Sequence, residues 1–217
     1  MTTSNMTAPS NFAHRYEPAA RSGAPTLLLL HGTGGNERDL LPLGQMIAPG
    51  AALLSPRGKV LEHGVPRFFR RLAEGVFDEA DVRARALELA DFIEAARKEY
   101  GLPAPVALGY SNGANIAAAL LYLRPEVLGG AVLLRAMVPL GGAPEAGLDG
   151  KPVLILSGAM DPIVPAGNAG QLAGTLKDAG AAVTHRTLPA GHELSQADIG
   201  AARNWLAALE AAASEAA

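Results

Sequence analysis

The chain alternates between short apolar runs and longer segments whose apolar residues recur at helical spacing, and polar or glycine-rich loops separate the two. Short continuous apolar runs are typical of strands that are buried on both faces of a parallel sheet. The last run instead alternates between apolar and polar residues, which indicates a strand near the edge of the sheet. The predicted strands are 26–30, 51–55, 106–109, 130–136, 152–158 and 182–188.

The segments between these runs predict helices, because their apolar residues fall on one face at a period of about 3.6 residues. Asp39 is placed to cap the first helix, and Pro42 would lie in its first turn. Gly101 would cap the C-terminus of the second. The predicted helices are 39–48, 81–100, 112–123, 166–179 and 196–212.

The order of these elements predicts the fold class. Strands that alternate with helices form a mainly parallel sheet with helices on both faces. The chain has no internal repeat and no interdomain linker, so we predict one α/β domain over 13–213 and a flexible segment over 1–12. The segment 56–80 lacks a clear period and is predicted to be a long loop. The chain is too short for a large cap domain.

Composition narrows the function classes. The 217 residues are 49% apolar and 18% charged with a net charge of −3, which gives no electrostatic reason to expect nucleic acid or an anionic membrane as a partner. The absence of cysteine excludes disulfides, thiolate metal sites and a cysteine nucleophile. The chain begins without a secretory signal, and no apolar run reaches the ~18 residues that span a bilayer. We therefore expect a cytoplasmic protein without a membrane span.

The candidate chemistry begins at the pentapeptide GYSNG, residues 109–113, which joins a predicted strand to a predicted helix. The pattern G-x-S-x-G makes a tight, strained turn that needs glycine on both sides of the serine. Ser111 would then stand above the carboxyl edge of the sheet, at a helix N-terminus whose free N–H groups favour developing negative charge. The alternative is a glycine-rich turn that happens to contain a serine.

A serine nucleophile needs a general base, and the base needs a carboxylate that orients it. In this kind of sheet the three residues follow one another in the order nucleophile, acid, base. Asp161 and His192 each follow a predicted strand, so both would reach the sheet edge where Ser111 lies. Of their competitors, His185 lies inside a strand, and Glu193 is too close to the base to reach its far ring nitrogen.

Two backbone N–H groups are expected to stabilise the oxyanion of an acyl-transfer reaction. One belongs to Asn112, and the other belongs to Thr33 in the loop HGTGG after the first predicted strand. His31 is expected to hold this loop through hydrogen bonds, and a metal or base role is the alternative. The acidic and histidine residues show no convincing metal-ligand spacing, and HGTGG does not match a P-loop. We therefore expect neither a metal nor a cofactor.

Substrate specificity is expected to come from the long segment 56–80 and from the residues around Asp161. Apolar side chains there would wall a pocket, and three arginines, Arg67, Arg70 and Arg71, would meet an acidic substrate. The alternative is that the phenylalanines belong to the core and the arginines to a solvated face. The candidate pocket residues are Phe68, Phe69, Leu72, Phe77, Met160, Ile163 and Val164.

These landmarks carry a resemblance. The chain resembles the α/β-hydrolase superfamily and, more narrowly, the small bacterial carboxylesterase and phospholipase/carboxylesterase family, which includes acyl-protein thioesterase-like enzymes. The matching stretches are LLLLHGTGGNERDLLPL, LGYSNGANIAAALL, ILSGAMDPIVP and LPAGHEL. The resemblance implies a sheet of about seven strands, a triad of Ser111, His192 and Asp161, and hydrolysis of carboxylic esters or thioesters without a cofactor. It also leaves a homodimer open.

The expected function is that of a serine carboxylesterase, which cleaves small to medium acyl esters through an acyl-enzyme on Ser111. A thioesterase or lysophospholipase would use the same triad. Acyl-protein thioesterases usually carry glutamine after the nucleophile and leucine in the oxyanion loop, where this chain has Asn112 and Thr33. That departure argues against protein deacylation and long-chain lipid substrates. A third alternative, from another class, is a non-catalytic ligand receptor that keeps the hydrolase fold.

Overall fold

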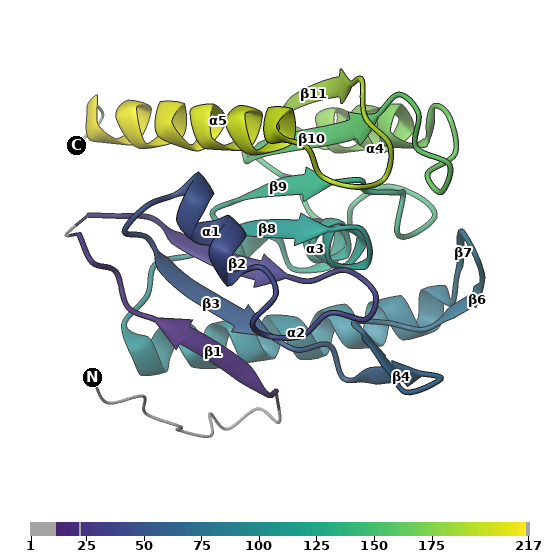
Figure 1. Cartoon of the computed structure of the whole chain (residues 1–217), viewed down its shortest axis with the longest axis horizontal. Coiled ribbons are helices and arrows are strands. Elements are labelled where there is room, and N and C mark those ends of the chain that lie inside the picture. Colours follow the sequence, from purple (N-terminus) through teal and green to yellow (C-terminus); the bar gives the residue numbers. More distant parts are fainter. Residues whose placement is uncertain (1–11, 22, 216–217) are drawn as a thin grey trace.

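The computed structural model describes residues 12–21 and 23–215, and within them seven strands form one sheet (Figure 1). Their order is β1-β3-β2-β8-β9-β10-β11, and all neighbours are parallel except β1, which pairs antiparallel with β3. The prediction of a mainly parallel α/β sheet is confirmed. The strands are β1 (His14–Glu17), β2 (Thr26–Leu30), β3 (Ala52–Pro56), β8 (Val106–Tyr110), β9 (Gly130–Leu134), β10 (Pro152–Gly158) and β11 (Ala182–Leu188).

The N-terminal edge of the sheet differs from the prediction. β1, with the sequence HRYE, was not predicted because it has no apolar run, and it joins the sheet by pairing with β3. Phe12 falls within the predicted flexible segment 1–12, yet it is buried and its ring centroid lies 5.1 Å from that of Phe92. The rest of that predicted segment, residues 1–11, lies outside the described residues.

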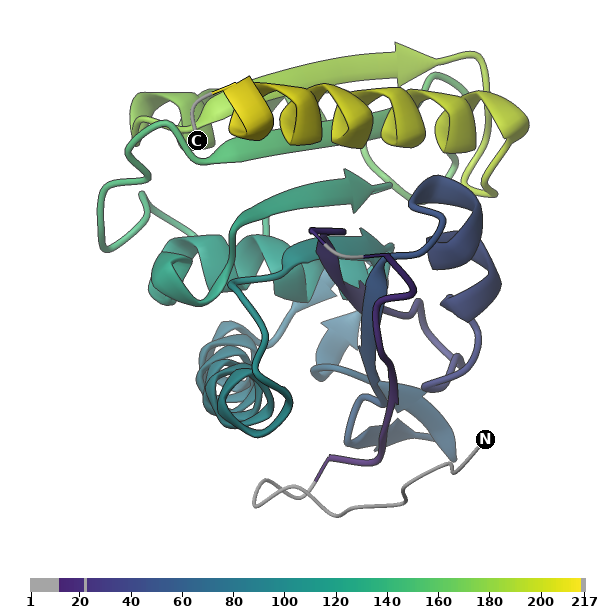
Figure 2. The same ribbon diagram turned by 90° about the vertical axis from the view of Figure 1, so that its left-hand side faces the viewer.

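Helices cover both faces of the sheet, as predicted. In Figure 2, α2 and α3 lie to one side of the strands and α1 to the other. α4 contributes to the same hydrophobic core as α2 and α3, and α5 packs with α1. The helices are α1 (Leu41–Ile47), α2 (Glu79–Tyr100), α3 (Asn112–Leu123), α4 (Asn168–Asp178) and α5 (Gln196–Glu215), with a short 3-10 helix at Pro125–Val127.

The apolar runs of the inner strands β2, β3, β8, β9 and β10 are continuous because each of these strands faces two hydrophobic cores. In β2, Leu28 and Leu30 belong to the core under α2, α3 and α4, whereas Leu27 and Leu29 belong to the core under α1 and α5. Successive side chains of a strand point to opposite faces of the sheet, so both sets must be apolar. All four leucines are fully buried.

Two helix boundaries show how capping sets the ends. Asp39 does not cap α1 as predicted, because its Oδ2 accepts from the N–H of Asn36 and the helix begins two residues later, at Leu41. α2 begins earlier than predicted, because the side chain of Asp78 caps it by accepting from the N–H of Asp81. Gly101 ends α2 in the left-handed region with φ 66°, as predicted.

The segment between β3 and α2, predicted as a long loop, contains two short antiparallel hairpins. Strands of two or three residues are too short to give an alternating pattern, so the sequence does not mark them. The described residues contain no large cap domain over the carboxyl edge of the sheet. The hairpins are β4 (Val60–Glu62) with β5 (Val65–Arg67), and β6 (Arg71–Ala73) with β7 (Val76–Phe77).

Candidate active site

Ser111 lies in the turn between β8 and α3, at the carboxyl edge of the sheet, with φ 52° and ψ −113°. This backbone conformation is costly for a residue with a side chain and is typical of functional turns. A Cβ atom at Gly109 would lie 2.5 Å from the carbonyl oxygen of Gly113, and one at Gly113 would lie 1.9 Å from that of Leu30. The predicted need for glycine on both sides of the serine is therefore confirmed.

A chain of hydrogen bonds joins three loops at this edge. Oγ of Ser111 lies 2.9 Å from Nε2 of His192, and Nδ1 of His192 lies 2.9 Å from Oδ2 of Asp161. The loops after β8, β10 and β11 supply these side chains, and in Figure 1 the arrowheads of all three strands point to the same edge. An imidazole with its proton on Nδ1 donates to Asp161 and accepts the hydroxyl proton of Ser111.

The carboxylate of Asp161 is held in its charged form. Its side chain is only 2% exposed, and this burial would raise its pKa. The backbone N–H of Ile163, the ring of His192 and the backbone N–H of Val164 all donate to it. Together these hydrogen bonds outweigh burial and hold the pKa of Asp161 below its usual range. A charged carboxylate in this position fixes the tautomer of the histidine.

The loop after β2 brings Thr33 to the same site. Thr33 and Asn112 line one pocket together with Ser111 and His192. The N–H of Gly34 donates to the carbonyl of Pro66 at 2.9 Å, which fixes the loop against the hairpin β4–β5.

His31 holds this loop, as predicted. Its Nε2 accepts from the N–H of Gly58 at 2.9 Å, so Nδ1 carries the proton and donates to the carbonyl of Gly32 at 2.7 Å. Burial lowers the pKa of His31, so the ring stays neutral. With both nitrogens occupied by the backbone, neither a base role nor a metal role fits this histidine.

The side chain of Asn112 is buried at this site and hydrogen-bonded. Its Oδ1 accepts from the N–H of Phe68 at 2.7 Å, and the whole residue is 3% exposed. The start of α3 is thereby fastened to the end of the hairpin β4–β5. Sequence analysis missed this role because the partner is a backbone group distant in the chain.

The pocket beside Ser111 has a volume of about 240 Å³. Of the predicted pocket residues, Phe77, Ile163 and Val164 line it. Phe68 and Phe69 lie instead in the hydrophobic core, 3% and 0% exposed, which corrects their prediction.

Two further pocket predictions are corrected. Leu72 is 70% exposed and Met160 is 67% exposed, and neither lines the pocket. Successive residues of a strand face opposite sides, so the strand β6 turns Arg71 toward the pocket and Leu72 away from it.

The three arginines of this segment have different environments. Arg67 is 3% exposed and Arg71 is partly exposed, and both line the pocket and pair with Glu62. Arg70 is outside the pocket and pairs with Asp78. The solvated-face alternative therefore describes Arg70 and does not describe Arg67.

Tyr110, the second residue of the pentapeptide, also contacts the site. Its ring centroid lies 5.5 Å from that of His192, and its hydroxyl donates to the carbonyl of His192 at 3.2 Å. A Cβ atom at Gly32 would lie 2.9 Å from the ring of Tyr110, so the loop after β2 needs glycine there. The sequence showed Tyr110 only as the variable position of the motif.

Arg135, directly after β9, ties down the loop that carries His192. Its Nε donates to the carbonyl of Gly191 at 2.8 Å, and its Nη2 donates to the carbonyl of Glu193 at 3.0 Å. Both its Nη atoms also donate to the carboxylate of Asp198, at 2.7 and 2.9 Å. A charged residue at the end of an apolar run could have indicated this role in the sequence. The predicted strand 130–136 instead includes Arg135 as an ordinary strand residue.

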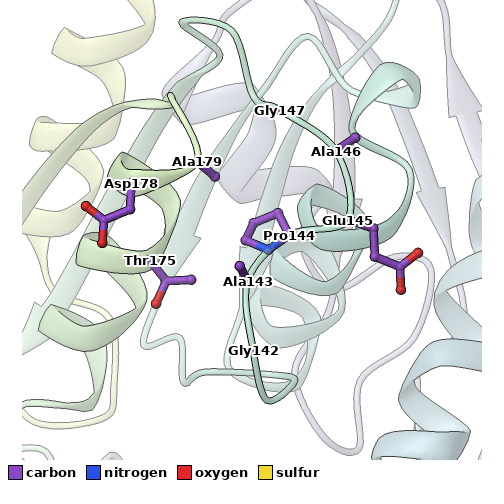
Figure 3. Close-up of a pocket in the computed structure, with 9 residues that line it drawn as sticks. All are labelled: Gly142, Ala143, Pro144, Glu145, Ala146, Gly147, Thr175, Asp178 and Ala179. Atoms are coloured by element: carbon purple, nitrogen blue, oxygen red, sulfur yellow. The ribbon is translucent and has the colours of Figure 1, made fainter.

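A larger pocket of about 580 Å³ lies away from these residues, between the loop 142–147 and α4 (Figure 3). Its two carboxylates, Glu145 and Asp178, lie on opposite sides of it. The lining of this pocket includes the hydroxyl of Thr175, and it includes none of the predicted site residues. Its larger size does not make this pocket the reactive site, because its lining residues do not include a nucleophile next to a general base.

Neither a metal cluster nor a membrane helix is found in the part of the chain that the structure describes. Over 12–21 and 23–215, no group of three or more histidine or acidic side chains is arranged to hold a metal ion. Over the same residues, no helix has both the length and the hydropathy to cross a bilayer.

A family model described as phospholipase/carboxylesterase matches residues 14–210. The chain belongs to the phospholipase/carboxylesterase family. MhqD from Bacillus subtilis (strain 168) is 47% identical over 194 residues, which are 88% of this chain and 96% of MhqD. The family is one of hydrolases, and the chain is accordingly a carboxylic ester hydrolase.

Solved structures of similar proteins agree with this assignment. The Bacillus cereus carboxylesterase is 47% identical with a TM-score of 0.88, covering 91% of this chain and 94% of that one. The Mesorhizobium loti carboxylesterase is 34% identical with a TM-score of 0.88, covering 95% and 99%. YahD, solved with malic acid, is 31% identical with a TM-score of 0.85, covering 90% and 98%. The sheet and its helices therefore have the α/β-hydrolase fold.

Proposed function

We propose that this carboxylic ester hydrolase is a serine carboxylesterase in which Ser111 is the nucleophile, His192 the general base and acid, and Asp161 the orienting carboxylate. The observation that carries the proposal is the continuous pair of 2.9 Å hydrogen bonds from Ser111 through His192 to Asp161. In the first step, Oγ of Ser111 attacks the ester carbonyl carbon while Nε2 of His192 takes the hydroxyl proton. The leaving alcohol then departs with that proton, and an acyl-enzyme remains.

The second step returns the enzyme to its starting state. His192 takes a proton from water, the resulting hydroxide attacks the acyl carbon, and the acid leaves as Ser111 recovers its proton. In both steps the carbonyl oxygen gains negative charge. We place this oxyanion on the backbone N–H groups of Thr33 and Asn112, which line the pocket with Ser111. No cofactor is needed for either step.

The size of the pocket supports small to medium acyl groups. Its volume of about 240 Å³ lies below the range of roughly 300–1,000 Å³ that is usual for pockets that enclose drug-sized ligands. Long acyl chains would extend beyond it. A thioesterase or lysophospholipase would use the same triad, so acyl-chain length and leaving group distinguish these alternatives.

The test compares p-nitrophenyl acetate, butyrate, octanoate and palmitate with the wild type, Ser111→Ala and Ser157→Ala. Ser157 is a matched control, because its Oγ also lies 2.9 Å from a histidine nitrogen, Nε2 of His185, on the strands β10 and β11. We expect turnover of the acetate and butyrate by the wild type and by Ser157→Ala, and none by Ser111→Ala.

Three results would contradict the proposal or part of it. An active Ser111→Ala variant would remove the nucleophile assigned here. An inert wild type that binds esters tightly would favour the non-catalytic receptor. Preference for palmitate, or for acyl thioesters over the matched oxygen esters, would replace the small-ester assignment with the lysophospholipase or thioesterase alternative.

A further inference from the structure

The wall of the pocket beside Ser111 holds two guanidinium groups that share one carboxylate. Nη1 of Arg67 lies 3.1 Å from Oε2 of Glu62, and Nε of Arg71 lies 2.9 Å from Oε1 of the same side chain. Both arginines line the pocket together with Ser111 and His192. Two positive charges against one negative charge leave this part of the wall with a surplus of one positive charge.

The position of Arg67 is electrostatically unfavourable without a further anion. Its side chain is only 4% exposed. Burial first, and then the neighbouring charge of Arg71, lower the pKa of Arg67. Its contact with Oε2 of Glu62 lacks the alignment of a hydrogen bond, so this Nη1 has an ion-pair partner but no hydrogen-bond acceptor. Buried charged groups are normally hydrogen-bonded as well as paired. Nη1 itself is enclosed by protein, so a ligand in the pocket would meet the small exposed part of the Arg67 side chain and the more exposed side chain of Arg71.

The other charges that line the pocket do not cancel this surplus at the wall. The charge of Arg135 is matched by Asp198, which binds both its Nη atoms. Glu74 lies at the exposed tip of the hairpin β6–β7, where water screens its charge. The buried part of the wall therefore remains cationic, while the carboxylate of Glu74 lies in solvent.

We propose that Arg67 and Arg71 form a subsite for a carboxylate of the substrate, so that the preferred substrates are short esters that carry a free carboxylate in addition to the ester bond. Guanidinium groups bind carboxylates through planar, charge-assisted hydrogen bonds, which suit a pair of arginines in a confined wall. The inference rests on the proposed function, because the carboxylate is held while Ser111 attacks the ester of the same molecule.

Two matched pairs of esters test the preference. Monomethyl succinate and methyl butyrate differ in having a carboxylate or a methyl group at the end of the acyl chain. O-butyrylglycolate and ethyl butyrate differ in the same way on the alcohol side. Hydrolysis is followed by pH-stat titration, because alkyl esters of this kind hydrolyse slowly without an enzyme. We expect kcat/KM to be at least about tenfold higher for the charged member of one pair, which is the effect of one charge-assisted hydrogen bond.

Variants of three charged residues should change the charged-to-uncharged ratio of kcat/KM in different directions. Arg71→Gln should reduce the charged-to-uncharged ratio of kcat/KM by roughly tenfold, through a higher KM for the charged ester. Glu74→Gln should raise the ratio about twofold, because it removes a screened negative charge from the pocket. Arg70→Gln is the control, since Arg70 is the neighbouring arginine that pairs outside the pocket with Asp78. It should keep the wild-type ratio.

Arg67→Gln is a further test that needs a folding control, because Arg67 is buried and its Nε donates to the carbonyl of Phe69 at 3.2 Å. The charged-to-uncharged ratio of kcat/KM for Arg67→Gln is interpreted only if the circular dichroism of this variant matches that of the wild type. If it does not match, the result for Arg71→Gln alone decides the proposal. No preference for the charged ester in either pair, or equal ratios in Arg71→Gln and Arg70→Gln, would overturn the subsite. Turnover of methyl butyrate that is lost in Ser111→Ala would then leave the proposed function standing, whereas wild-type protein inert to all four esters would overturn both.

Discussion

The guanidinium of Arg135 and the carboxylate of Asp198 form a buried, two-pronged ion pair whose side chains are 0% and 1% exposed. The same guanidinium donates to the carbonyls on either side of His192, those of Gly191 and Glu193. Asp198 in turn accepts from the N–H and the hydroxyl of Ser195. The loop that carries the proposed base is therefore fastened to the end of β9 and to the start of α5.

Arg135→Lys should lower kcat by about tenfold or more with little change in KM, because an ammonium group cannot make the forked contacts of a guanidinium. Arg135 acts here as a positioning residue, through the loop of His192. Steady-state kinetics on p-nitrophenyl butyrate provide the measurement. Arg124→Lys is the control, since Arg124 pairs with Glu94 and Glu126 on the surface. A kcat loss of the same size in both variants would show that the contacts of Arg135 have no particular role.

Asp198→Asn should destabilise the protein at neutral pH by about 3–5 kcal/mol, because it leaves the charge of Arg135 buried without a partner. Burial would raise the pKa of Asp198, but the hydrogen bonds from Arg135 and Ser195 outweigh it and hold the pKa below its usual range. A lowered pKa in the folded state means that the stabilisation is present above about pH 4, the unfolded value. It is lost as the pH falls through the folded value.

Urea unfolding of wild type and Asp198→Asn at a series of pH values measures this dependence. The difference in unfolding free energy should be constant near neutrality and should narrow below about pH 4. A difference that stayed the same through the acid range would contradict the assignment of a charged carboxylate to Asp198.

Asp161→Asn should lower kcat by roughly 10³–10⁴-fold while the fold is kept, because an amide no longer fixes the imidazole in the tautomer that can accept a proton. The oxygen of the amide can still accept from the backbone N–H groups of Ile163 and Val164, so the loop keeps its shape. Kinetics and near-ultraviolet circular dichroism of the same sample separate the two effects. Full activity in Asp161→Asn would exclude the proposed role of Asp161.

Two glycine-to-alanine changes should have opposite effects on stability. At Gly113 the new Cβ would lie 1.9 Å from the backbone oxygen of Leu30, so Gly113→Ala should prevent native packing of α3 against β2. At Gly170 in α4 the new Cβ would meet open space, so Gly170→Ala should stabilise the protein by about 0.5–1 kcal/mol. Thermal unfolding of both variants provides the comparison, and a stable, active Gly113→Ala would refute the close approach.

The parts of the site that follow local rules could be predicted from the sequence. Ser111, Asp161 and His192 each follow a strand, and the carboxyl ends of parallel strands meet at one edge of the sheet. The glycine pattern around Ser111 describes the turn itself. Strand alternation and apolar runs gave the sheet and its two cores for the same reason, since they depend on near neighbours in the chain.

The parts that depend on distant packing could not be predicted. Arg135 and Asp198 are 63 residues apart, and the sequence around each residue gives no indication that the two form a pair. Phe68 and Phe69 resemble pocket residues in sequence, but Phe69 packs edge-on against Phe77 in the core. The hairpins of that segment are held by pairings of only a few residues each, which leave no periodic signal.

The hydrogen bond between Ser111 and His192 joins residues 81 positions apart, and it connects a central strand of the sheet to the loop beyond its last strand. Closing a loop of this length costs more chain entropy than closing a short one, so we expect this contact to form after the more local ones. A chain that has collapsed and built β2, β8 and β9 but has not yet docked β11 and α5 therefore holds a strained serine without a base. Recovery of esterase activity during refolding should thus report completion of the sheet rather than its nucleation, and any truncation that removes β11 should abolish activity at once.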